Sequence, residues 1–377
     1  MNRSKLNEIC LNITDGTHST VKDNSESNYY LLSCKNIKNG KIIINEKDRT
    51  ISYDTLMLLR KRTDMEFNDV LLTSVGTIGE SSVITERSPN FEFQRSVAVL
   101  KPDAKYILSK YLHYFFISTK GQRIIKENIK GAAQPCLFLN DIKNIEIDYP
   151  SIKTQQHIVN TIGSVDDLIE NYQKQADKIC DILRQSINKY NEYVTISEYD
   201  PDIIKSGIKM FDNEKTYLDT SSINGVNNIT SGELITYNKK PSRANIQPIG
   251  NSVWFAKMKD SNKILIITDK DQDIIKNNIL STGFLGIKSS NKLPLSLLTA
   301  IIISDHFKVQ RDLNSVGTTM AGINNETFSK ILVPKLTDEE IKEYDKKYNN
   351  LVYRLSYIRQ EIKLLSKIKE NLLSKYF

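Results

Sequence analysis

The sequence predicts an α+β protein in which two mixed α/β globules alternate with two long helices that pair as an antiparallel coiled coil, giving a pseudo-two-fold molecule. Three observations predict this class. Two stretches carry apolar residues at steps of four and three, which is a heptad seam. The stretches begin 183 positions apart, as a duplicated unit would. Before each stretch lie short β-branched and aromatic runs that are typical of strands.

Length and composition set the limits. A chain of 377 residues has room for two or three domains, and 39% apolar with 26% charged residues is typical of a soluble globular protein. Apolar runs such as 300–303 are too short to span a membrane, and residues 1–6 do not open a signal peptide, so we expect a cytoplasmic protein. A net charge of +7 suits a polyanionic partner and equally suits a merely basic protein.

The four cysteines predict no metal site. Cys10, Cys34, Cys136 and Cys180 are far apart and have no histidine partner at zinc spacing. We expect free thiols in a reducing compartment.

We divide the chain into a first globule (1–152), a central helix (153–195), a second globule (196–335) and a C-terminal helix (336–377). Residues 70–73, 96–100 and 252–256 are expected as strands, and residues 108–127 and 295–312 as helical stretches. Residues 191–210, with Pro201 and Gly207, are expected as the linker into the second globule.

The two long helices have matching start signals. Thr154 and Thr337 follow prolines and are expected as N-caps, and Thr337 forms a capping box with Glu340. The first seam comprises Ile158, Ile162, Val165, Ile169, Tyr172, Ala176, Ile179 and Leu183. The second comprises Tyr344, Tyr348, Leu351, Leu355, Ile358, Ile362, Leu365, Leu372 and Tyr376, with Lys369 interrupting it.

The repeat extends into the globules. Gly131 and Gly317 lie 186 positions apart, and each opens a short loop, 131–134 and 317–320. A helix of about 40 residues is roughly 60 Å long, and we expect the second helix to run back along the first. The alternative is two independent amphipathic helices, each on its own domain. Two similar basic globules on a rigid spacer suit a ligand that is itself two-fold and periodic, such as duplex DNA.

Motifs across nearly the whole chain resemble the specificity subunits of type I restriction–modification enzymes. In the first half these are TDGTH (14–18), LSCKNI (32–37), DVLLTSVGTIG (69–79) and GAAQP (131–135). In the second half they are KPSRANIQP (240–248) and VWFAKM (253–258).

The resemblance implies two target recognition domains, each reading one part of a bipartite DNA sequence, with the helices fixing the gap. It implies no chemistry in this chain. Two modification subunits, which bind S-adenosylmethionine and methylate adenine, would dock on the helices, and restriction subunits could join them. The sequence itself has no amino-methyltransferase motif and no phosphate-binding glycine loop.

Candidate DNA contacts in the first globule are polar side chains beside turns. Lysine and arginine suit phosphates and guanine, while asparagine and glutamine suit adenine. For the segment 73–77, the need for a tight strand connection is the stronger alternative. The candidates are Asp15, Thr17, His18, Lys35, Asn36, Thr73, Ser74, Thr77, Gln94, Arg95 and Gln134.

In the second globule, basic and amide side chains are concentrated in residues 239–247, which suits DNA binding. The alternative is that this segment is a solvated loop. The candidates are Lys239, Lys240, Ser242, Arg243, Asn245, Gln247 and Lys257. Trp254 is expected in the core.

Two other functions remain open at this point. A coiled-coil scaffold or adaptor would use the helices without any DNA contact. A single-chain modification enzyme would need a cofactor site that the sequence does not display.

Overall fold

The computed structural model describes residues 1–24, 26–317 and 321–377, and the chain divides into two compact units. The first unit comprises residues 1–168 and 365–377, and the second comprises residues 169–364. Residues 318–320 of the expected second glycine loop lie outside the described residues. Each unit contains part of both long helices, α6 (Ile152–Ile187) and α11 (Asp338–Tyr376).

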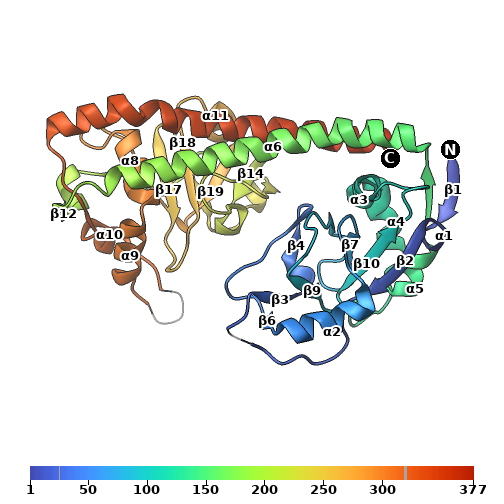
Figure 1. Cartoon of the computed structure of the whole chain (residues 1–377). Coiled ribbons are helices and arrows are strands. Elements are labelled where there is room, and N and C mark those ends of the chain that lie inside the picture. The colour runs from blue at the N-terminus through green and yellow to red at the C-terminus, as the bar shows by residue number, and fades with distance from the viewer. Residues whose placement is uncertain (25, 318–320) are drawn as a thin grey trace. The chain divides into compact units, whose positions relative to one another are not determined.

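The first unit is built around a four-stranded antiparallel sheet in the order β2-β10-β7-β8 (Figure 1). A smaller sheet, β6-β3-β9, contains the parallel pair β3–β9, and β1 pairs with β11 and β4 with β5. The strands are β1 (Asn2–Lys5), β2 (Cys10–Asp15), β3 (Tyr29–Leu32), β4 (Ile37–Lys38), β5 (Lys41–Ile42), β6 (Thr50–Ile51), β7 (Val70–Thr73), β8 (Ser81–Val83), β9 (Phe91–Phe93), β10 (Val97–Pro102) and β11 (Glu146–Tyr149). The helices are α1 (Leu6–Ile9), η1 (Cys34–Asn36), α2 (Tyr53–Thr63), α3 (Ser109–Ile117), α4 (Thr119–Glu127) and α5 (Leu139–Asn144).

The second unit repeats this topology. Its four-stranded antiparallel sheet has the order β13-β20-β17-β18, and a second sheet, β15-β14-β19-β16, again contains one parallel pair, β14–β19. The strands are β12 (Tyr193–Thr195), β13 (Asp202–Ile203), β14 (Lys215–Leu218), β15 (Glu233–Ile235), β16 (Ala244–Ile246), β17 (Ser252–Ala256), β18 (Ile264–Ile267), β19 (Asn278–Ser281), β20 (Phe284–Lys288) and β21 (Leu332–Pro334). The helices are η2 (Ile196–Tyr199), η3 (Thr220–Ser222), η4 (Tyr237–Lys239), α7 (Gln272–Asn277), α8 (Leu295–Ile303), α9 (Asp305–Leu313) and α10 (Asn325–Ser329).

The two units also interrupt their equivalent helical stretches at an equivalent serine. The expected helical stretches 108–127 and 295–312 are each two helices, interrupted at Ser118 and Ser304. Each serine hydroxyl caps the following helix by accepting a backbone N–H, from Gly121 at 3.1 Å and from Phe307 at 3.1 Å. Because serine competes for backbone donors in this way, it ends one helix and starts another.

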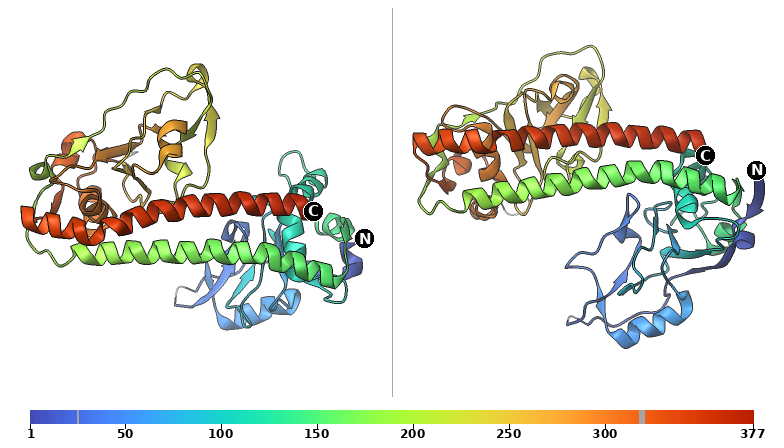
Figure 2. Two further views of the ribbon diagram at one scale, coloured as in Figure 1. Left: turned by 90° about the horizontal axis from the view of Figure 1, so that it is seen from above. Right: turned by 45° about the horizontal axis from the view of Figure 1, so that its top comes forward.

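The long helices pair antiparallel within the second unit. Arg354 donates from Nη2 to Oε1 of Gln175 at 2.9 Å, and the hydroxyls of Ser186 and Tyr344 are hydrogen-bonded. The contacts therefore advance along α6 as they retreat along α11, and Figure 2 shows the two helices side by side over this stretch. The seam residues Ile179, Leu183, Tyr344, Leu355 and Ile358 are buried in one core. The alternative of two independent helices is excluded.

The first unit holds the opposite ends of both helices in its own core. Ile158 and Ile162 of α6 and Leu373 of α11 are buried there. Lys369, which interrupts the apolar seam, lies with its Nζ 2.6 Å from Oδ1 of Asp166. Lys369 therefore replaces an apolar seam contact with an ion pair between α11 and α6.

Three boundaries differ from the sequence expectation. Helix α6 begins at Ile152, and Ser151 accepts the backbone N–H of Thr154, so Thr154 is not the N-cap. The helix ends at Ile187, short of 195, because Tyr193–Thr195 pairs with β21. The expected linker 191–210 also contains Ile196 and Tyr199, which are buried in the second unit. The capping box of Thr337 and Glu340 is confirmed, with bonds of 2.8 and 3.3 Å.

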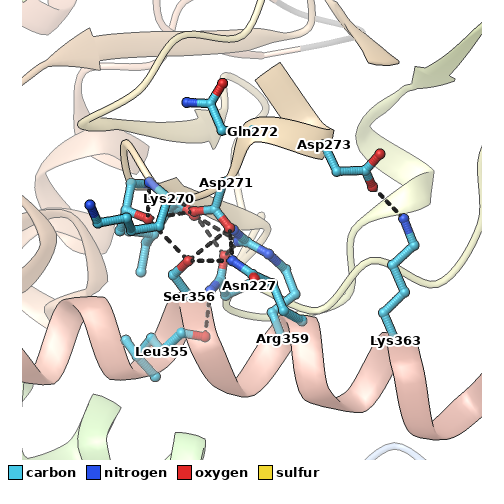
Figure 3. A network of polar contacts seen from close by, with 12 residues as sticks. Asn227, Lys270, Asp271, Gln272, Asp273, Leu355, Ser356, Arg359 and Lys363 are labelled. Atoms are coloured by element: carbon cyan, nitrogen blue, oxygen red, sulfur yellow. Dashed lines mark hydrogen bonds and ion pairs between the residues drawn. The ribbon is translucent and has the colours of Figure 1, made fainter. Parts of the chain in front are cut away.

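A buried charge pair fixes α11 to the sheet of the second unit (Figure 3). Nη2 of Arg359 lies 2.7 Å from Oδ1 of Asp271, and Nη1 donates to the carbonyl of Ile266 at 2.7 Å and to Asn227. Ser356 donates to the same Asp271 oxygen at 2.7 Å. Burial is the largest single influence and opposes ionisation of Asp271, but the charge of Arg359 and the hydrogen bonds from Arg359, Ser356 and the Thr268 backbone together hold the pKa of Asp271 below its usual range.

Replacing Asp271 with alanine should lower the free energy of unfolding by about 3–5 kcal/mol, because Arg359 would stay buried without its carboxylate. The double variant Asp271→Ala, Arg359→Met should recover most of this loss, since it leaves no buried charge. Urea denaturation measures the free energy of unfolding of the single and the double variant. The matched control is Asp273→Ala, which removes an exposed pair with Lys363 and should cost less than about 1 kcal/mol. A loss in Asp271→Ala no larger than in this control would contradict the prediction.

Acid should destabilise the first unit through His113, whose Nδ1 lies 3.2 Å from the Ser81 hydroxyl and whose burial lowers its pKa from 6.5 to about 4. Between these values the unfolded chain binds the proton and the folded chain does not, so stability falls as the pH falls, by up to roughly 3 kcal/mol. Thermal melts across this pH window should show a weaker acid dependence for His113→Gln than for the wild type. An unchanged slope in His113→Gln would refute the assignment.

Candidate nucleic-acid interface

The segment after β2 is held in place by charge. Asp15, the last residue of β2, accepts a hydrogen bond from Nη2 of Arg62 at 2.5 Å, and its other oxygen lies 2.8 Å from Nε2 of His18. Arg62 lies in the last turn of α2. Asp15 therefore positions His18 and is not itself free for a ligand.

Gly16 permits a close approach of two backbones. A Cβ at this position would lie 2.0 Å from the carbonyl oxygen of Phe93. The next residue, Thr17, donates its backbone N–H to that oxygen at 2.9 Å and is buried. Glycine is required here because the space beside β9 admits no side chain.

This approach forms an open pocket of about 350 Å³. It brings together two pairs of sequence-predicted residues, Thr17 with His18 and Gln94 with Arg95, from segments about 75 positions apart. It also includes Arg49, which the sequence did not single out. The lining residues are Thr17, His18, Ser19, Thr20, Leu31, Arg49, Gln94 and Arg95.

Lys35 and Asn36 have different positions. Lys35 is exposed, with Nζ 3.0 Å from Oδ1 of Asp48. Asn36 is 1% exposed, and its amide donates to the Ile43 carbonyl at 2.9 Å and to Asp48 at 2.7 Å. Burial would raise the pKa of Asp48, but hydrogen bonds from Asn45, Lys35 and Asn36 outweigh this and lower it. Asn36 thus supports the loop, and its amide is not available to an adenine.

The segment 73–77 is chiefly a tight strand connection, the stronger of the two alternatives. Thr73 is buried, and its hydroxyl donates to the Glu80 carbonyl at 3.2 Å and to that of Thr77. The buried Ser74 donates to the Arg95 carbonyl at 3.3 Å. Gly76 and Gly79 have φ of 74° and 97°, which L side chains rarely adopt. Only Thr77 of the three predicted residues is exposed.

Four loops of the first unit converge around this hairpin. The backbone N–H of Cys34 donates to the Ser96 hydroxyl at 3.1 Å, and the Thr77 hydroxyl donates to the Cys34 carbonyl at 3.4 Å. Val75 and Cys136 form a bridge, as do Lys130 and Cys136. Exposed side chains of Lys35, Thr77, Arg95 and Gln134 consequently belong to one group of neighbouring loops.

In the basic segment of the second unit, residues 239–247, some side chains are exposed and others make contacts within the unit. Lys239, Ser242 and Arg243 are exposed, whereas Lys240 lies over the Tyr237 ring at 5.9 Å and Asn245 is half-buried. Gln247 is engaged, since its amide donates to the Ile275 carbonyl at 2.5 Å and accepts from Lys215 at 3.3 Å. Gln247 therefore fastens the segment and is not available to a base.

Lys257 joins the basic segment to its neighbouring loops. Its Nζ donates to the Thr282 carbonyl at 3.0 Å, and the Thr282 N–H donates to the Arg243 carbonyl at 2.9 Å. Burial lowers the pKa of Lys257. The bridges Met258–Gly322 and Val316–Gly322 repeat those of Val75–Cys136 and Lys130–Cys136 in the first unit. The bridged loops of the first unit are thus repeated in the second, and the basic segment, which precedes β17, joins them through Thr282.

Trp254 is confirmed in the core, fully buried, with Nε1 donating to the Ser252 hydroxyl at 2.8 Å.

In residues 1–24, 26–317 and 321–377, no cluster of three or more histidine, cysteine or acidic side chains could hold a metal ion. Over the same residues, no helix has both the length and the apolar character that a membrane span needs.

Residues 1–180 match the family model described as the type I restriction modification DNA specificity domain. The EcoBI specificity subunit of Escherichia coli is 31% identical over 157 residues, 42% of this chain and 32% of that protein. The MjaIX specificity subunit of Methanocaldococcus jannaschii is 32% identical over 108 residues, 29% and 24% of the two chains. The match covers less than a third of either relative's length.

The fold is similar over the whole chain to the crystal structure of the S subunit of a type I restriction-modification system from M. genitalium. The TM-score is 0.50 at 14% identity, covering 100% of this chain and 96% of the other. At this identity the likeness establishes the fold. The predicted arrangement of two mixed globules and two long helices is thereby confirmed.

Gly16→Ala should destabilise the first unit by at least about 2 kcal/mol, because the new Cβ would force the Phe93 and Thr17 backbones apart. Gly163→Ala is the matched control: its Cβ would make only an ordinary 3.7 Å contact with the Tyr114 hydroxyl, and alanine favours the helix by up to about 1 kcal/mol. Urea denaturation should therefore move the two midpoints in opposite directions. Equal midpoints for the two variants would contradict the conclusion that the space at residue 16 admits only glycine.

Proposed function

We propose that this chain, whose residues 1–180 belong to the type I restriction modification DNA specificity domain family, is the sequence-specificity subunit of a type I DNA-modification complex. The family match carries the proposal. The repeat of the same sheet order and loop bridges in the second unit extends the assignment to the second half of the chain.

Two recognition units in one chain imply a bipartite DNA target. Each unit would read one short half-site with its own group of loops, and the paired helices would set the unspecified gap. The apolar seam supports a spacer of fixed length, because helices that bury a common seam cannot slide without exposing it.

The chain would perform no chemistry. Two modification subunits would dock on the helices, each with S-adenosylmethionine as the methyl donor for adenine, and restriction subunits would join in a full restriction complex. The names of the relatives, which are called specificity subunits, support this division of labour. A cytoplasmic location follows from DNA as the substrate.

A coiled-coil scaffold without DNA contact is the weaker function. It accounts for the helices but not for the match of the first 180 residues to a DNA specificity domain. It also leaves unexplained why exposed basic side chains lie on or beside the bridged loops in both units.

Genome-wide methylation mapping of a host that carries this gene with its methyltransferase partner should find modified adenines in a split motif with an unspecified gap. Deleting this gene alone should abolish that methylation, since the methyltransferase would lack its specificity subunit. A contiguous motif, or methylation that persists without this chain, would overturn the proposal.

Inserting seven residues into both long helices, after Leu168 in α6 and after Leu364 in α11, where each helix passes from one unit to the other, should lengthen the gap of the motif. Seven residues add about 10 Å, or roughly three base pairs at 3.4 Å each, and preserve the heptad phase. Methylation mapping of the variant provides the measurement. The same insertion in α6 alone puts the seams out of step and serves as the control for disrupted pairing. An unchanged gap in the double insertion would refute the spacer role.

A further inference from the structure

The pocket of the first unit has the chemistry of an anion site. None of the eight residues that line it is acidic, and His18 contributes an imidazole ring. Two arginines and three hydroxyl side chains surround it, and buried Leu31 forms part of its wall. Such a pocket offers hydrogen-bond donors and positive charge, which suit an anion.

Arg95 has the freedom that a ligand-binding arginine needs. Its side chain is exposed and makes no hydrogen bond or ion pair with the part of the chain that the structure describes. Its backbone is fixed, because its N–H donates to the Thr17 carbonyl at 3.0 Å and its carbonyl accepts from Ser74 at 3.3 Å. The guanidinium is therefore mobile on a rigid base.

The opposite wall is held in place. Arg49 donates from Nε to Asp23 and from Nη2 to the Val21 carbonyl, which leaves Nη1 for a ligand. The His18 ring is fixed by its 2.8 Å contact with Asp15. The site is thus preorganised on one side and completed by Arg95 on the other.

We propose that this pocket binds a phosphate of the DNA backbone, with Arg95 as its principal ion-pair partner and Arg49 as its fixed donor. The inference rests on the proposed function. A phosphate suits the site better than a base edge, because guanidinium groups pair with phosphate oxygens and the pocket walls carry no carboxylate to accept from a base amino group. Arg95 then sets the position of the unit on DNA, and sequence reading falls to the other loops.

Nonspecific binding tests this without knowledge of the target sequence. The full-length chain would be titrated with random-sequence duplex over a series of KCl concentrations, and the slope of log K against log[KCl] compared among variants. Arg95→Gln should reduce the steepness of this slope by about 0.9 and weaken binding roughly eightfold near 0.1 M salt, as loss of one phosphate contact predicts. Arg95→Lys should stay close to the wild type, because a point charge suffices for a phosphate.

The control is Arg123→Gln, which removes an exposed arginine of α4 that does not line the pocket and should leave the slope unchanged. An Arg95→Gln slope equal to that of this control would overturn the proposal, as would Arg95→Lys behaving like Arg95→Gln, the result expected for bidentate base reading. Inorganic phosphate, titrated calorimetrically, separates the sources: tight binding lost in Arg95→Gln with an unchanged duplex slope would assign the pocket to a free phosphate. A wild type that binds no duplex would refute the proposed function itself.

Discussion

Burial of the two apolar seams is the constraint on which the rest of the structure depends. Helices of 36 and 39 residues that carry large apolar side chains every three or four positions are stable only where those side chains are covered. In each unit, segments of both helices enter one core together with the sheet and the shorter helices. The fold of each unit is therefore completed by residues from distant parts of the sequence, and the last residues of the chain belong to the core of the first unit.

Much of the fold follows from periodic signals. The heptads, the capping box at Thr337 and the repeat spacing are local or strictly periodic, so the sequence displays them directly. The boundaries that differed depend on competition between elements. The end of α6 at Ile187 is set by the pairing of Tyr193–Thr195 with a strand about 140 positions away, and no local pattern announces such a partner.

The candidate interface was predictable in its location more than in its individual residues. The turn motifs correctly marked loops that the fold gathers together. Asn36 and Gln247 were predicted because amides suit adenine, and Thr73 and Ser74 because a small polar turn can approach a DNA backbone closely. The same groups also satisfy backbone atoms of the protein, and here that use prevails. Arg49 and Arg62 were missed because their importance arises from contacts across the fold, with no motif around them.

The buried Arg359 also makes the second globule and the C-terminal helix dependent on each other during evolution. Its carboxylate partner, Asp271, lies in the second globule, while the arginine itself lies in the C-terminal helix. A recombination event between residues 271 and 359 that replaced the globule with one lacking this aspartate would leave the Arg359 charge buried without a partner. Viable recombination junctions should therefore lie beyond residue 359, so that the globule and its helical anchor are inherited together.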